Sequence, residues 1–384
     1  MTRKKLSIQF ITALLLVILL GVNFQAVDAF QTTPPANDNI VDAINMGSMP
    51  YSNSQSTAGA TIEAGEPEYH CGYELGGSVW YTYTASSSGL IEVDTFTSDF
   101  DTVLHVYEDQ GGRNLLPIAC NEDDQDLQSR SVFHGEAGQQ YLIGVAGYSG
   151  AVGNLAIQAD QYDCPGDALC ATVSDANGSM VLNPRIELFD NSGFVARGWG
   201  SGGYVEISSL SSGEYEVGVT GKQVFMVEEG VSVPGYHHFS AQGLPAVEIT
   251  SRDKQGSLLQ NPGVFLTDGR YDGWVGQGSP LTVHVSPGPY DVDAVGWSDS
   301  YLLSVADQNV SDQGASILLD ASEMPYDTIT VNWDSFAGGY LTSPGSIYSY
   351  WLNVEDGQNA YIAVPQSEYT LSGVVQIDVD PDTW

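Results

Sequence analysis

Basic residues are scarce in this sequence. Lys and Arg number 11 against 48 Asp and Glu in 384 residues, the formal net charge is −37, and no Lys or Arg follows Arg270. Nucleic acids and anionic membranes attract basic proteins, so the composition argues against both as partners. Charged residues are nevertheless only 15% of the chain, aromatic residues reach 10%, and glycine is frequent at 43. This composition is typical of folded β-structure with many turns and an acidic surface.

The common catalytic signatures are also missing. The sequence contains no Gly-x-Ser-x-Gly elbow, no His-Glu-x-x-His and no Gly-x-x-x-x-Gly-Lys. Residues 198–203 spell Gly-x-Gly-x-x-Gly, but no helical pattern follows that could hold a pyrophosphate. Carboxylate pairs arise by chance among 48 acidic residues, and none stands out as a general acid. We therefore expect a protein that is not an enzyme.

The N-terminus has the pattern of a secretory signal peptide. Basic residues 3–5 precede an apolar run over residues 8–20, and residues 27–29 (VDA) are small residues at the cleavage-site spacing. The run is short for a membrane span of about 20 residues, which favours cleavage over an uncleaved anchor. We expect residues 1–29 to be removed and residues 30–36 to form a linker. The mature chain is then secreted, extracellular or at the cell surface, without membrane insertion.

Only four cysteines are present, and an exported chain allows them to form disulfides in three pairings. Cys164 and Cys170 enclose a short segment with Pro and Gly, which indicates a local loop. We favour Cys164–Cys170 and, by consequence, Cys71–Cys120. Zinc binding is the competing interpretation, but no Cys-x-x-Cys pair exists.

Residues 37–160 predict a β-sandwich. Short alternating runs, such as residues 90–96 and 102–107, are separated by Gly, Ser and Asp turns, and no amphipathic helix of useful length appears. His105 and His284 alternate with apolar neighbours, which predicts that both face solvent.

The same stretch resembles a known bacterial family. The motifs that carry the resemblance follow one another as Ala36-Asn37-Asp38-Asn39, residues 59–61 (GAT), 65–67 (GEP), 78–84 (SVWYTYT), 98–107 (SDFDTVLHVY), 119–124 (ACNEDD) and 147–148 (GY). In this order they are similar to the pre-peptidase C-terminal domain. The resemblance implies a non-catalytic, jelly-roll-like β-sandwich of secreted proteases and other surface proteins, whose relatives include calcium-dependent collagen-binding modules.

Acidic loops in this domain suggest a structural Ca²⁺ ion. Calcium takes six to eight oxygen ligands, and two loops offer such groups on Asp99, Asp101, Asn121, Asp123 and Asp124. The resemblance adds Asn37 and Asp38 at the N-terminal edge of the domain, although the glutamate usual in relatives is absent before them. The alternative is that the carboxylates of the first loop shape a turn and those of the second face water.

Beyond the fourth cysteine the sequence repeats itself. Residues 178–184 (GSMVLNP) recur at 256–262 (GSLLQNP), and residues 213–217 (GEYEV) recur at 288–292 (GPYDV), which are shifts of 78 and 75.

We expect small sandwiches over residues 161–245, 246–322 and 323–384, the last one divergent. They resemble carboxypeptidase regulatory-like, or transthyretin-like, modules of secreted bacterial proteins, and immunoglobulin-like repeats share their Gly-x-Tyr-x-Val ending. Each of these families implies a stalk or spacer.

Aromatic residues in the repeats are candidates for ligand binding, because sugar rings stack on flat aromatic faces. Trp199 and Trp274 lie 75 residues apart in matching regions, and Tyr348, Tyr350 and Trp351 form a later cluster. The alternative is that the two tryptophans anchor the cores of their repeats.

The sequence thus predicts an all-β chain of tandem antiparallel β-sandwich domains, jelly-roll-like first and then immunoglobulin- or transthyretin-like. We expect a secreted, non-catalytic binding or adhesion protein that recognises an extracellular polymer, protein or polysaccharide, and that calcium stabilises. Two alternatives remain. One is a spacer or extracellular-layer protein that associates with itself, and the other is an accessory portion of a secreted hydrolase.

Overall fold

The computed structural model describes residues 33–112, 114–296 and 301–323 with their side chains, and the backbone of five further strands. Within these residues the chain forms β-strands and two short 3₁₀ helices, η1 (Ile40–Asp42) and η2 (Tyr148–Gly150), without an α-helix. None of the described helices is long and apolar enough to cross a membrane. The expected all-β fold of tandem sandwiches is confirmed. The predicted signal peptide lies outside the described residues.

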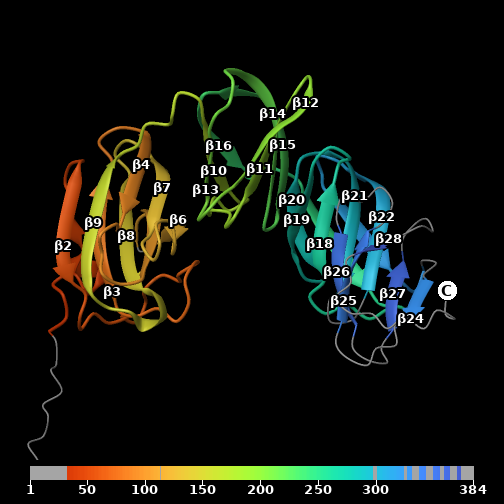
Figure 1. Ribbon diagram of the computed structural model, residues 1–384, viewed down its shortest axis with the longest axis horizontal. Coiled ribbons are helices and arrows are strands. Elements are labelled where there is room, and N and C mark those ends of the chain that lie inside the picture. The colour runs from red at the N-terminus through yellow and green to blue at the C-terminus, as the bar shows by residue number, and fades with distance from the viewer. Residues whose placement is uncertain are drawn as a thin grey trace, which may run out of the picture.

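The first domain is a two-sheet sandwich, seen at one end of Figure 1. Its strands are β1 (Ile44–Asn45), β2 (Tyr51–Ser56), β3 (Ser78–Thr84), β4 (Gly89–Asp94), β5 (Thr102–Asp109), β6 (Leu115–Asn121), β7 (Arg130–Gly135), β8 (Gln140–Gly147) and β9 (Asn154–Gln161). They form sheets of order β1-β3-β8-β5-β6 and β2-β9-β4-β7. Because β2 pairs with β9, β3 with β8, β4 with β7 and β5 with β6, all antiparallel, the chain is one long hairpin wound into the expected jelly roll.

The larger sheet of this domain is buried on both faces. Its inner face packs into the sandwich core with residues such as Tyr81, Leu104 and Ile143. Its outer face carries a second cluster of Trp80 and Tyr107, which Tyr69 and other residues of the preceding loops cover. His105 lies on β5 and is completely buried. The prediction that His105 faces solvent was therefore wrong, because alternation along a strand does not reveal that a loop covers the second face.

Two repeats of one sandwich follow. The first contains β10 (Leu169–Ser174), β11 (Arg185–Asp190), β12 (Gly193–Trp199), β13 (Tyr204–Ile207), β14 (Gly213–Gly221), β15 (Val224–Val233) and β16 (Gly235–Ser240). The second contains β17 (Ala246–Arg252), β18 (Gly263–Thr267), β19 (Asp272–Gln277), β20 (Leu281–Val285), β21 (Gly288–Gly296), β22 (Tyr301–Val310) and β23 (Ala315–Asp320). Most pairs are antiparallel, but β10–β16 and β17–β23 are parallel.

For the third unit the backbone of five strands is described. They are β24 (Asp327–Thr330), β25 (Ala337–Thr342), β26 (Ser349–Val354), β27 (Asn359–Ala363) and β28 (Thr370–Ser372). Figure 1 places them beside the second repeat, at the opposite end from the first domain.

Neighbouring repeats are joined through continuous sheets. Strand β15 of the first repeat pairs in parallel with β20 of the second, which gives a seven-stranded sheet β12-β11-β14-β15-β20-β17-β23. Strand β22 pairs in parallel with β27 and gives a six-stranded sheet that crosses into the third unit. The register repeats as well, since Val224 opposes His284 and Tyr301 opposes Tyr361, with both partners shifted by 77 residues. The same edge contact thus links each unit to the next.

The two faces of the seven-stranded sheet serve different repeats. On β15, Val224 and Met226 belong to the core of the first repeat. Their neighbour Phe225, which points to the other face, belongs to the core of the second repeat, where its ring meets that of Tyr290 at 5.3 Å. One strand therefore supplies side chains to two cores.

Candidate functional site

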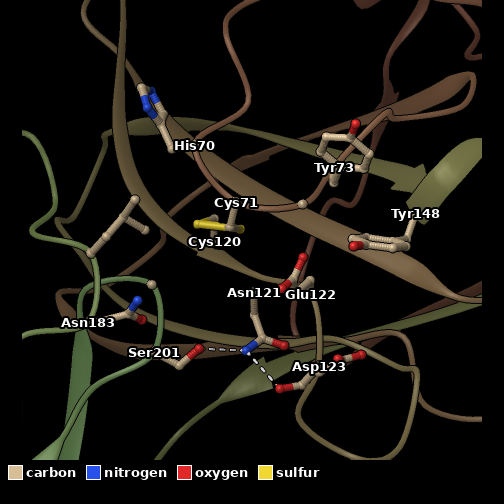
Figure 2. A pocket seen from close by; sticks show the side chains of 13 residues that line it. His70, Cys71, Tyr73, Cys120, Asn121, Glu122, Asp123, Tyr148, Asn183 and Ser201 are labelled. Atoms are coloured by element: carbon tan, nitrogen blue, oxygen red, sulfur yellow. Dashed lines mark hydrogen bonds between the residues drawn. A yellow bond between two sulfur atoms is a disulfide. The ribbon is translucent and has the colours of Figure 1, made fainter. Parts of the chain in front are cut away.

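A cavity of about 440 Å³ lies where the first domain meets the first repeat. Loops at the end of β6, before β3 and at η2 form one wall, and two loops of the first repeat form the other (Figure 2). The lining consists of His70, Cys71, Gly72, Tyr73, Cys120, Asn121, Glu122, Asp123, Tyr148, Leu182, Asn183, Ser201 and Gly202.

The joint beneath this cavity is held by direct hydrogen bonds between the domains. Asn121 Nδ2 donates to Ser201 Oγ of the first repeat at 2.8 Å. Asn121 Oδ1 accepts from the Arg130 backbone N–H of its own domain at 3.0 Å, which holds the amide in place. The Cys120 N–H donates to the Gly202 carbonyl oxygen at 3.3 Å. Gly202 has φ +56°, and a Cβ at this position would overlap the Cys120 carbonyl, so only glycine fits this close approach.

A disulfide forms the base of the cavity. Cys71 is bonded to Cys120 with their Cα atoms 6.2 Å apart, and Cys164 is bonded to Cys170 with Cα atoms 5.9 Å apart, so the structure has the expected pairing. Below the first bond, His105 Nε2 accepts hydrogen bonds from the backbone N–H groups of His70 at 3.1 Å and Cys71 at 3.3 Å. The loop that carries Tyr73 is thereby tied to β5 and β6.

Several polar groups around the cavity have no partner. The side chains of Tyr73, Glu122, Asp123, Tyr148 and Asn183 make no hydrogen bond or ion pair within the described part of the chain. Figure 2 shows the two tyrosines on one side, Asn183 and Ser201 on the other, and Glu122 between them. Tyr73 is 61% exposed. Groups that converge on a cavity while unpaired are available to a ligand.

Of the predicted calcium ligands, Asn121 and Asp123 line this cavity, and Asp101 lies close by. The pKa of Asp101 is raised, first because the carboxylate is partly removed from water and second because the charge of Asp123 opposes its ionisation. The amide of Asn121 is already used in the joint between the domains.

Asp99 instead takes the alternative, turn-shaping role. Its Oδ1 accepts from the Asn154 backbone N–H at 2.6 Å and its Oδ2 from Asn154 Nδ2 at 2.7 Å. These two hydrogen bonds, the backbone one first, lower the pKa of Asp99. Both carboxylate oxygens therefore connect the β4–β5 turn to the start of β9.

Asn37 and Asp38 also spend their polar atoms within the fold. Asn37 Nδ2 donates to the Trp80 carbonyl at 2.9 Å, and its Oδ1 accepts from Gln55 at 2.8 Å. Asp38 accepts from the Thr61 N–H at 2.7 Å and from the Thr61 hydroxyl at 2.8 Å. They fasten the N-terminal segment to the first sandwich.

The carboxylates do not gather into one ligand cluster. Burial raises the pKa of Asp124, while the charge of nearby Arg130 lowers it. Among the described residues, the one group of three metal-ligating side chains within 4.8 Å is Cys71, His105 and Cys120. Its sulfurs are bonded to each other and the histidine Nε2 already accepts hydrogen bonds. The seven predicted ligands are thus divided between the cavity and separate structural contacts.

The two predicted tryptophans lie on the surface of the repeats, away from the cavity lining. Trp199 is 66% exposed and Trp274 is 38% exposed, so neither anchors a core. The prediction that the two tryptophans occupy matching positions of the repeats was wrong. Trp274 opposes Phe265, whereas Trp199 opposes Arg185, which does not correspond to Phe265.

The residue that matches Trp274 in the first repeat is Arg197. It opposes Glu187, which lies 78 residues before Phe265, and its guanidinium sits 5.6 Å from the Phe194 ring and 5.7 Å from the Trp199 ring. Tyr350 and Trp351 are on β26, but their side chains, like Tyr348 as a whole, lie outside the described residues.

Sequence reasoning missed the cavity residues Tyr73, Glu122, Tyr148 and Asn183. A signal existed for two of them, because Glu122 sits inside the acidic cluster and Asn183 precedes a proline in the repeated motif. Asn183 has φ +50°, a left-handed conformation that asparagine tolerates at turns. Nothing in the sequence indicates that loops from two domains meet here.

No protein-family profile and no curated protein matches the sequence. Solved structures that resemble it include the Bacillus anthracis TIE protein, at 11% identity and a TM-score of 0.18 over 84% of this chain and 72% of that one. The pilus adhesin SpaC from Lactobacillus rhamnosus GG aligns at 10% identity and 0.17 over 72% and 48%, so this chain spans about half of SpaC. The pilus backbone RrgB from Streptococcus pneumoniae aligns at 8% and 0.16 over 71% and 100%. These alignments carry no argument about function.

Proposed function

We propose that this chain is a non-catalytic extracellular binding protein, in which the repeats form a stiff spacer and the joint of the first two domains binds a partner. The observation that carries the proposal is the continuous sheet that joins successive units in one register. Domains joined by flexible linkers need no strand pairing with one another. A spacer that holds a binding site at a fixed distance needs such pairing, because it makes the array stiff.

The unpaired groups around the interdomain cavity support binding. Two tyrosines and two carboxylates point to a ligand with both a polar and a flat or charged part. The jelly roll of the first domain agrees with its resemblance to the pre-peptidase C-terminal family, and we propose this assignment on the motifs of residues 78–84 and 98–107.

We retain Ca²⁺ as a proposed structural ion, with Asp101 and Asp123 as its candidate ligands. The support is that partial burial, and second the charge of Asp123, raise the pKa of Asp101, and a bound cation would relieve the repulsion between the two carboxylates.

A binding screen tests the proposed function. The mature protein is passed over immobilised collagen, cellulose, chitin and other polysaccharides, once with calcium and once with chelator, and an unrelated protein of similar acidity controls for ion exchange. We expect retention on at least one polymer and weaker retention with chelator. Absence of retention on every polymer, together with a mass that grows with concentration in sedimentation, would instead establish a layer-forming protein.

A further inference from the structure

We propose that the interdomain cavity binds a basic side chain, lysine or arginine, of an extracellular protein. This inference rests on the proposed binding function and names the ligand chemistry of the same site.

The charge of the cavity favours a cation. Glu122 and Asp123 line it without internal partners, and Asp101 lies near Asp123. Among the lining residues there is no Lys or Arg, and His70 is the one basic side chain. The net charge of −37 adds a long-range field that attracts basic partners and raises their association rate.

The tyrosines supply the second part of the recognition. Figure 2 shows Tyr73 and Tyr148 on one side of the cavity, with Tyr148 directed toward Glu122. A guanidinium or ammonium group over a tyrosine face gains cation–π attraction while its N–H groups donate to carboxylates. The planar guanidinium suits this combination best, because it stacks and forms paired hydrogen bonds at once.

Other ligands fit this geometry less well. No three described carboxylates come within 4.8 Å, so the Ca²⁺ proposed at Asp101 and Asp123 would take its other oxygens from backbone or water and would leave Glu122 unpaired. A neutral sugar could use the unpaired hydroxyls and the Asn183 amide, but it would leave the charges of Glu122 and Asp123 without a counter-charge. Of the five unpaired groups, Glu122 and Asp123 carry negative charge, and no Lys or Arg among the lining residues balances it.

The site is also preorganised. The Cys71–Cys120 disulfide fixes the wall of the first domain, and hydrogen bonds from Cys120 to Gly202 and from Asn121 to Ser201 hold the two walls together, so a ligand does not have to order them.

The test uses a short peptide in which a single arginine is the one charged side chain. It is compared with the same peptide carrying citrulline in place of the arginine. Citrulline keeps the shape of arginine and lacks its charge. Titration calorimetry at physiological salt is expected to show a Kd for the arginine peptide at least about tenfold lower than for the citrulline peptide.

Three variants locate the binding. Glu122→Gln and Asp123→Asn each remove one charge from the cavity and break no internal contact, and we expect each to raise the Kd of the arginine peptide about tenfold. Glu229→Gln removes the same charge from an exposed position on β15 and is expected to change the Kd less than twofold. Thermal melting verifies that all three variants fold.

Three results would overturn the assignment. They are equal Kd values for the two peptides, an equal loss of affinity for the arginine peptide in all three variants, or binding of a neutral oligosaccharide in the cavity instead of the arginine peptide. If polymer retention persists while the arginine preference is absent, the ligand class alone is wrong. If retention is absent as well, the proposed function fails with it.

Discussion

His105 is the residue whose environment departs furthest from its sequence pattern. Its ring is completely buried between Tyr69, at 4.4 Å edge-on, and Tyr107, stacked at 6.2 Å. Burial, with a smaller contribution from His70, lowers the pKa of His105 from 6.5 to about 3. Because Nε2 accepts two N–H groups, the neutral ring carries its proton on Nδ1, which has no partner among the described residues.

This burial predicts a pH dependence of stability. The unfolded chain protonates His105 near pH 6.5 and the folded chain only near pH 3, so its contribution to folding is full above 6.5 and is lost as pH falls between these values. The slope is roughly 1.4 kcal/mol per pH unit in that window. His105→Gln keeps an acceptor for the two N–H groups without titrating, so we expect its deficit in unfolding free energy to shrink between pH 7 and pH 4.5.

Urea unfolding of both proteins at the two pH values measures the difference. Parallel pH dependence of wild type and variant would contradict the assignment of the buried ring as neutral.

Among the elements, β14 shows how the first two repeats pack against each other. Tyr271, just before β19 of the second repeat, is 1% exposed and lies over Gly218 of β14. Its hydroxyl donates to Glu216 at 2.9 Å, and Arg270 pairs with the same carboxylate at 2.5 Å. A Cβ on Gly218 would overlap the Tyr271 ring, so this strand position has to be glycine.

Gly218→Ala should therefore destabilise the protein by about 1–3 kcal/mol, because a buried ring wedged between repeats has no room to move. Gly213→Ala on the same strand is the matched control. A Cβ there would lie 3.8 Å from the nearest ring atom, so we expect a neutral or slightly stabilising effect. Denaturant unfolding compares the two variants, and equal effects would show that the Gly218–Tyr271 contact does not join the repeats.

In the whole molecule, the shared seven-stranded sheet couples units that the repeat pattern presents as separate domains. Adjacent residues of β15 illustrate this, since Phe225 is buried in the core of the second repeat and Met226 in the core of the first. Substituting Phe225 therefore perturbs the second repeat, and substituting Met226 perturbs the first, although both lie on the same strand.

We expect Phe225→Ala, which removes about 3–5 kcal/mol of core packing, to accelerate hydrogen exchange in β18 and β21 of the second repeat. Met226→Ala should accelerate exchange in β10 and β13 of the first repeat. Hydrogen exchange followed by mass spectrometry locates each effect. Faster exchange confined to the first repeat in both variants would contradict the shared sheet.

Much of this architecture follows from local pattern. Alternation and turn residues predict the strands, two cysteines six residues apart predict a local disulfide, and the Gly-x-Tyr-x-Val motif reveals the repeats. Such features depend on residues close together in the chain, where conformational preferences are strong. The acidic net charge likewise depends on composition alone.

The tertiary structure alone decided the contacts between distant segments. The burial of His105, the role of Asp99 in fastening β9, the register that places Trp274 opposite Phe265, and the cavity between two domains each need a partner from elsewhere in the chain. The parallel pairing of β15 with β20 is of the same kind. A strand's own sequence states which residues are apolar but not which layer covers each face, because that depends on packing with segments far along the chain.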